Sequence, residues 1–180
     1  VLGVLTNPAI NFKAWGTIET GSYLNGKELN FSRPETESPV LLLGPGQYAG
    51  PSYQRALEKL QPDKVLIKRS QVRKALMIMA DEADYTFSFP SEVFNGFSLN
   101  YWDIAAAIAI FKSAGGVATD LYGNDIDFSG PDLKIKQGHF LASPGVGRHI
   151  RDYLDQLIEE RKSFGVILHP CLDRKNQENQ

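Results

Sequence analysis

The chain alternates between short apolar runs and polar breaks rich in glycine and proline, and this rhythm changes near residue 40. Before that point the pattern predicts strands over 1–6 and 12–18, and Asn25–Gly26 between apolar flanks indicates a hairpin turn. After it, fully apolar runs typical of buried strands alternate with segments of helical periodicity. We expect strands over 40–43, 65–67, 84–89, 117–121 and 140–142. We expect helices over 52–60 (with Ser52 as N-cap), 70–80, from Trp102 to Ser113, and over 146–161.

This order of elements predicts an α/β fold of layered α+β type, in which helices pack on a mixed or parallel sheet. The first 39 residues resemble part of a different, antiparallel sheet that belongs to an N-terminal domain. Residues 40–161 form the α/β domain, and the polar residues 162–180 are expected to be a disordered tail. Because the chain opens inside a strand, we expect a fragment or a processed product.

Composition excludes several classes of protein. A net charge of −2 over 180 residues does not indicate a nucleic-acid polymer or a membrane surface as a partner. No apolar run is long enough to span a bilayer. The single cysteine, Cys171, excludes an internal disulfide framework and fits a reducing, cytoplasmic location.

Asp103 is the one carboxylate at the start of a predicted helix that is otherwise apolar. Two roles are open for it from the residues alone. It can cap the helix by accepting a hydrogen bond from a backbone N–H, or it can supply one oxygen ligand to Mg²⁺. One carboxylate cannot make a complete metal site, so further ligands would have to come from elsewhere.

A basic cluster surrounds the start of the helix predicted over 70–80. It is a natural phosphate site or, alternatively, a solvated basic face, and its members are Lys68, Arg69, Arg73 and Lys74. His139, beside an apolar strand, is interpreted as structural. The sequence carries no nucleophile elbow, Walker A loop or dinucleotide fingerprint.

Two ordered motifs carry a family resemblance. The first is Val1-Leu2-Gly3-Val4 with Asn7-Pro8, followed by Gly21-Ser22-Tyr23-Leu24-Asn25-Gly26-Lys27. The second is Trp102-Asp103-Ile104-Ala105-Ala106, followed by Ala114-Gly115-Gly116-Val117 and Thr119-Asp120-Leu121-Tyr122-Gly123. Together they resemble the C-terminal part of the inositol monophosphatase superfamily, which includes the 3'(2'),5'-bisphosphate nucleotidases, over about residues 1–154.

The resemblance implies a layered α/β/α/β/α fold and a Mg²⁺-dependent phosphomonoesterase, in which metal ions activate a water molecule. It also implies that Asp103 is a metal ligand. The family's other ligands lie on an upstream Glu and a D-P-[IL]-D-G-T motif, and this sequence has no Asp-Gly dipeptide. We therefore predict that this chain alone is inactive. It is either part of a complete phosphatase or a non-catalytic interaction or regulatory protein that keeps the C-terminal fold.

The substrate implied by the resemblance is a phosphorylated small molecule, either a bisphosphate nucleotide or an inositol phosphate. Lys74 falls where the nucleotidases carry a lysine in a Ser-Ser-Leu-Lys segment, although the three preceding residues differ. Lys74 and Arg73 are thus candidates for the substrate phosphate. The family's inositol-binding Glu falls at Gly96, and Glu92 is the nearby candidate to replace it. Expected partners are a second copy of the chain or a missing N-terminal half.

Overall fold

The structure, a computed structural model, describes residues 1–31, 38–91 and 98–163. A four-stranded antiparallel sheet opens the chain, its strands adjacent in chain order: β1 (Leu2–Asn7), β2 (Phe12–Thr17), β3 (Gly21–Leu24) and β4 (Lys27–Glu28). A single 3-10 turn, η1 (Pro8–Ile10), joins the first two strands. The predicted hairpin is confirmed, since Asn25 and Gly26 join β3 to β4 with φ values of 50° and 82°. Positive φ at both positions is what a type I′ turn requires.

A five-stranded mixed sheet forms the second part, in the order β6-β5-β7-β11-β9. Its strands are β5 (Val40–Leu43), β6 (Lys64–Ile67), β7 (Tyr85–Ser88), β9 (Val117–Thr119) and β11 (His139–Ala142). Strand β5 runs parallel to both neighbours, β6 and β7, whereas β11 is antiparallel to β7 and β9. A strand buried on both faces needs apolar residues throughout, which explains the run of leucines at 41–43.

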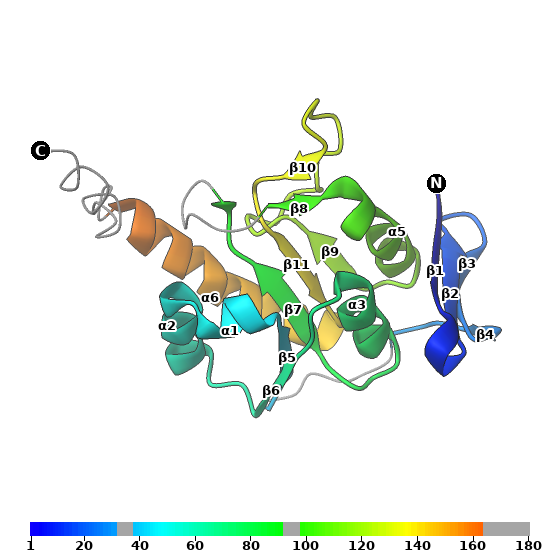
Figure 1. The fold of residues 1–180 in the computed structure, drawn as a ribbon, viewed down its shortest axis with the longest axis horizontal. Helices are drawn as coiled ribbons and strands as arrows, with labels where there is room; N and C mark the ends of the chain where they lie inside the picture. Colours follow the sequence, from blue (N-terminus) through cyan, green and yellow to red (C-terminus); the bar gives the residue numbers. More distant parts are fainter. Residues whose placement is uncertain (32–37, 92–97, 164–180) are drawn as a thin grey trace, which may run out of the picture.

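The helices complete four layers (Figure 1). Helices α3 (Gln71–Met79) and α5 (Ala105–Ser113) lie between the two sheets, and one apolar cluster joins them to both. Helices α2 (Pro51–Leu60) and α6 (Pro144–Ser163) cover the other face of the five-stranded sheet through a second cluster. The short helix α1 (Pro45–Ala49) follows β5 directly. The predicted α/β fold class, with a mixed sheet and a separate antiparallel sheet, is confirmed.

Glycines let the antiparallel sheet approach α5 closely. A Cβ at Gly3 would collide with the backbone oxygen of Ala106, and one at Gly16 would lie 2.7 Å from Ser113 Oγ. Both glycines face the helix, in alternation with exposed residues such as Val4. The antiparallel sheet therefore packs on α5 with the two backbones in close contact. This packing holds α5 in place, and with it the preceding segment that contains Asp103.

Several local expectations were wrong in detail. Helix α2 begins at Pro51 with Gly50 as N-cap, not at Ser52, because proline lacks the N–H that a cap would satisfy. The strand expected over 117–121 ends at Thr119, where Asp120 starts a turn. The two-residue strands β8 (Leu99–Asn100) and β10 (Lys134–Ile135) form a small antiparallel pair that had no signal in the sequence.

Helix α6 continues to Ser163, and the rest of the expected tail, 164–180, lies outside the described residues. Among the helices of the described ranges, none has the length and apolarity needed to cross a bilayer.

Candidate functional site

The carboxyl ends of three parallel strands meet at one edge of the five-stranded sheet. Strands β5, β6 and β7 end there, at Leu43, Ile67 and Ser88. Antiparallel β11 begins at the same edge, because His139 pairs with Ser88. In open α/β sheets this edge is where ligands bind. A cluster of polar side chains gathers there in the structure.

Gln47, in α1, is the centre of this cluster. Its Oε1 accepts hydrogen bonds from the backbone N of Gly44 at 2.7 Å and from Lys74 Nζ at 3.2 Å. Its Nε2 donates to the hydroxyl of Tyr53 and to the carbonyl of Phe87, both at 3.0 Å. The amide is thus fully used, and it ties α1 to α2, α3 and β7.

Lys74 is the charged member of the cluster. It lies on the first turn of α3, where Ser70 caps the helix by accepting a hydrogen bond from the backbone N of Arg73 at 3.2 Å. Because α3 is enclosed between the two sheets, the Lys74 side chain is 0% exposed. Burial lowers the pKa of Lys74 from 10.5 to about 8. At pH 7 the amine is still protonated, so a buried cation faces this edge of the sheet.

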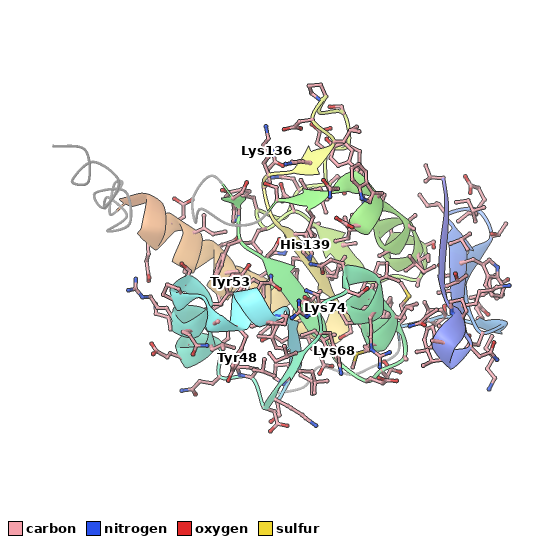
Figure 2. All side chains as sticks on the ribbon, in the orientation of Figure 1. Tyr48, Tyr53, Lys68, Lys74, Lys136 and His139 are labelled. Carbon is pink, nitrogen blue, oxygen red and sulfur yellow. The ribbon has the colours of Figure 1, made fainter. Side chains whose placement is uncertain are left out.

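His139 is the second buried titratable group, and its Nδ1 is hydrogen-bonded to Ser88 Oγ at 2.7 Å. Burial, together with the nearby charge of Lys74, lowers the pKa of His139 to about 3, so the ring is neutral near pH 7. Its Nε2 has no hydrogen-bond partner among the residues that the structure describes. Figure 2 shows Lys74, His139 and Tyr53 gathered in the interior of the molecule between α1, α3 and β7.

Tyr53 closes the cluster on the side of α2. Its hydroxyl accepts from Gln47 Nε2 and from the backbone N of Phe89 at 3.1 Å, and burial raises its pKa above the ordinary value. The ring packs against those of Phe87 and Phe89, with centroids 5.5 and 4.8 Å away. Tyr53 therefore links the polar cluster to the apolar core in which Phe87 and Phe89 are buried.

Asp103 lies at a different place, in the 3-10 turn η2 (Tyr101–Asp103). Of the two roles left open for Asp103, capping of the apolar helix is not observed, since the N-cap of α5 is Ile104. Instead, Asp103 Oδ2 accepts from the backbone N and the side-chain Nδ2 of Asn100, at 3.1 and 3.3 Å, and so caps η2. Within the described ranges Oδ1 accepts no hydrogen bond, so one oxygen of a half-buried carboxylate is available to a ligand.

Asp120, the other carboxylate of the signature, has a structural role. Its Oδ1 accepts from the backbone N of Tyr122 and of Asn124, at 2.9 and 2.7 Å. Its Oδ2 accepts from the side chain of Asn124 at 3.2 Å. These bonds close the turn after β9 and use both carboxylate oxygens.

The described residues do not fit a complete magnesium site. No group of three or more His, Cys, Asp or Glu side chains comes together anywhere in the three described ranges. Mg²⁺ is held by hard oxygen ligands, usually with more than one carboxylate or a substrate phosphate. Asp103 can supply one such oxygen, and we derive no reaction step through a metal ion from this chain.

The predicted site residues are only partly assembled. Lys74 joins Gln47, Tyr53 and His139, but no described contact links it to Asp103. Arg73 is half-buried, and its described hydrogen bond is made by its backbone. Glu92 lies outside the described residues. Sequence reasoning missed Gln47, Tyr53 and Ser88 and treated His139 as purely structural, because these residues meet only through the sheet topology.

The fold and site define an α/β protein with a buried cation at the carboxyl edge of its parallel strands. The sequence model of the inositol monophosphatase family matches residues 1–163, and the chain belongs to this family. The superfamily membership expected from the two motifs is confirmed.

Relatives and solved structures agree with this assignment. Over 132 residues the chain is 26% identical to the Golgi-resident adenosine 3',5'-bisphosphate 3'-phosphatase of Rattus norvegicus, covering 73% of this chain and 36% of that protein. Over 103 residues it is 31% identical to 3'(2'),5'-bisphosphate nucleotidase 1 of Dictyostelium discoideum, covering 57% and 31%. Staphylococcal IMPase-II bound to inositol monophosphate has the same fold, with a TM-score of 0.73 at 13% identity over 91% of this chain and 61% of that one. The chain thus spans about a third of the length of these two relatives.

Proposed function

We propose that this chain forms the substrate-side part of a Mg²⁺-dependent phosphomonoesterase acting on 3'(2'),5'-bisphosphate nucleotides. The observation that carries the proposal is the buried Lys74 ammonium at the carboxyl edge of the parallel strands, in a chain of a phosphatase family. A desolvated cation is costly unless a counter-charge compensates it. In this proposal a substrate phosphate supplies the counter-charge.

The choice of a nucleotide over an inositol phosphate has two supports. The relatives reported above include enzymes named for bisphosphate nucleotides. The position expected to contact an inositol hydroxyl is Gly96, which carries no side-chain oxygen.

The proposal gives Asp103 the role of one metal ligand through its available Oδ1. The remaining ligands belong to a D-P-x-D-G-T segment that this sequence does not contain, so the chain alone is expected to be inactive. They would come from a missing N-terminal half or another chain.

We further propose that the chain divides at residue 39, between a partial antiparallel-sheet segment and the α/β domain. We also propose a cytoplasmic location, which the single cysteine supports.

The alternative is a non-catalytic interaction or regulatory protein. It is favoured by one observation, that Asp103 already has a structural use as the cap of η2. In that case Asp103 would bind no metal ion in any assembly. Ligand binding at Lys74 would then be vestigial or absent.

Equilibrium binding tests the proposal on the chain itself. We expect adenosine 3',5'-bisphosphate to bind with at least tenfold higher affinity than inositol 1-phosphate in calorimetric titrations. The Lys74→Met variant should lose at least tenfold in nucleotide affinity, the effect of about 1.4 kcal/mol, because one charge-assisted hydrogen bond is removed. Arg69→Met is the matched control, since Arg69 precedes the cap residue of α3 and is exposed. Equal affinity for the two ligands, or unchanged binding in Lys74→Met, would contradict the proposal.

A further inference from the structure

Helix α1 supplies Gln47 to the polar cluster and is anchored by hydrogen bonds, without a buried apolar side chain of its own. None of its five residues is buried, and glycines flank it at positions 44 and 50. It is held by the four hydrogen bonds of Gln47 and by one from Gln54 Nε2 to the carbonyl of Tyr48. Segments with few buried apolar contacts open at low free-energy cost. Opening of α1 would therefore cost mainly these hydrogen bonds and little apolar burial.

Gln47 Oε1 occupies a position that suits a charged oxygen. It accepts from a backbone N–H, that of Gly44, and from the buried Lys74 ammonium. This pair of donors, one of them a desolvated cation, would bond an anionic oxygen more strongly than a neutral amide oxygen. An ammonium group has three donors, and the described residues use one of those on Lys74.

A second buried polar atom near Lys74 has no hydrogen-bond partner among the described residues. His139 Nε2 is fully buried without a partner among the described residues, and it lies near enough to Lys74 for the lysine charge to act on it. Buried polar atoms without partners are uncommon and call for an explanation. An incoming ligand or the water it brings would supply the missing partner.

We propose that α1 is a lid and that the Gln47 side chain is an internal substitute for a phosphate oxygen, which the substrate phosphate displaces. The inference rests on the proposed function in one respect, that Lys74 binds the substrate phosphate. It explains how a fully buried lysine can meet a ligand: the lid opens, Gln47 releases Lys74 and Gly44, and the phosphate oxygen takes both donors. The phosphate shifts the equilibrium between the closed and the open lid only by as much as it bonds these two donors more strongly than Gln47 does.

Two substitutions at Gln47 test the lid in opposite directions. Gln47→Ala removes the competing oxygen and should tighten the binding of inorganic phosphate to the full chain about tenfold, the effect of one hydrogen bond to a charged group. Gln47→Glu places a carboxylate against Lys74 and should weaken phosphate binding at least tenfold. Gln156→Ala and Gln156→Glu, at an exposed position of α6, are the matched controls and should stay within twofold of the wild type.

The outcomes separate the lid from the proposed function. Opposite shifts for Gln47→Ala and Gln47→Glu in calorimetric titration support the lid, even where the nucleotide shows no preference over inositol phosphate. Shifts in the same direction, or no shift, overturn the lid. If Lys74→Met abolishes phosphate binding while both Gln47 variants match the wild type, the lid is wrong and the proposed phosphate site stands.

Discussion

At the scale of single residues, the proposed phosphate-binding residue Lys74 is buried at a cost to the stability of the fold. Its side chain is fully buried, and its described partner is a neutral amide oxygen. An aliphatic residue of similar length would avoid the desolvation of a charge. A role in ligand binding thus explains the lysine better than a contribution to the stability of the fold. The two explanations predict different effects of replacing Lys74 on the free energy of unfolding.

We predict that Lys74→Met raises the free energy of unfolding at pH 7 by about 1–3 kcal/mol. The pH dependence has a definite sign. The folded-state pKa is about 8 and the unfolded value is near 10.5, so between these values the unfolded chain binds more protons. The wild type should therefore gain stability as the pH rises from about 8 to 10.5, and Lys74→Met should lack this gain. Urea titrations across this range measure both effects. A variant less stable than the wild type at pH 7 would contradict the prediction.

At the scale of elements, the short turn η2 separates Asp103 from the apolar helix α5. Asp103 is the third residue of η2 and bonds back to Asn100, while Ile104 begins α5 without a side-chain cap. The carboxylate is fixed through one oxygen only. An element that orients a carboxylate and leaves its second oxygen available is suited to a metal ligand.

Asp103→Asn should separate structure from chemistry, because asparagine keeps an acceptor for Asn100 but loses the charge. In the chain itself the substitution should cost less than about 1 kcal/mol of stability, measured by urea unfolding. In a protein that carries the complete metal site it should abolish phosphate release. Asp120→Asn is the informative comparison, since both oxygens of Asp120 serve a turn and its loss should act on stability instead. Turnover retained in a folded Asp103→Asn protein would contradict the assignment of Asp103 as a metal ligand.

At the scale of the whole molecule, what could be predicted from sequence was local. The leucine run of β5 and the Asn25–Gly26 turn each carry their signal within a few residues, and both were predicted correctly. The carboxyl edge of the sheet could not be predicted in the same way. Gln47, Lys74 and His139 lie 27 and 65 residues apart in sequence, and only the strand order brings them together. Lys74 was found through the basic cluster and the family resemblance, whereas nothing in the pattern around Gln47 distinguishes it from a surface glutamine.

The layered arrangement separates the proposed substrate site from the proposed metal ligand. The buried cation is built by the five-stranded sheet and α3, whereas Asp103 lies beyond β8, in the turn before α5. In the part of the chain that the structure describes, Lys74 is assembled with Gln47, whereas Asp103 joins no group of three or more potential metal ligands. This division is the basis of the proposed function.

The most direct test is a crystal structure of the chain with adenosine 3',5'-bisphosphate. We predict that one phosphate oxygen lies within hydrogen-bond distance of Lys74 Nζ and of the Gly44 backbone N, with the Gln47 side chain moved away. A nucleotide bound elsewhere, with Lys74 still bonded to Gln47, would contradict the claim that this edge of the sheet is the substrate site.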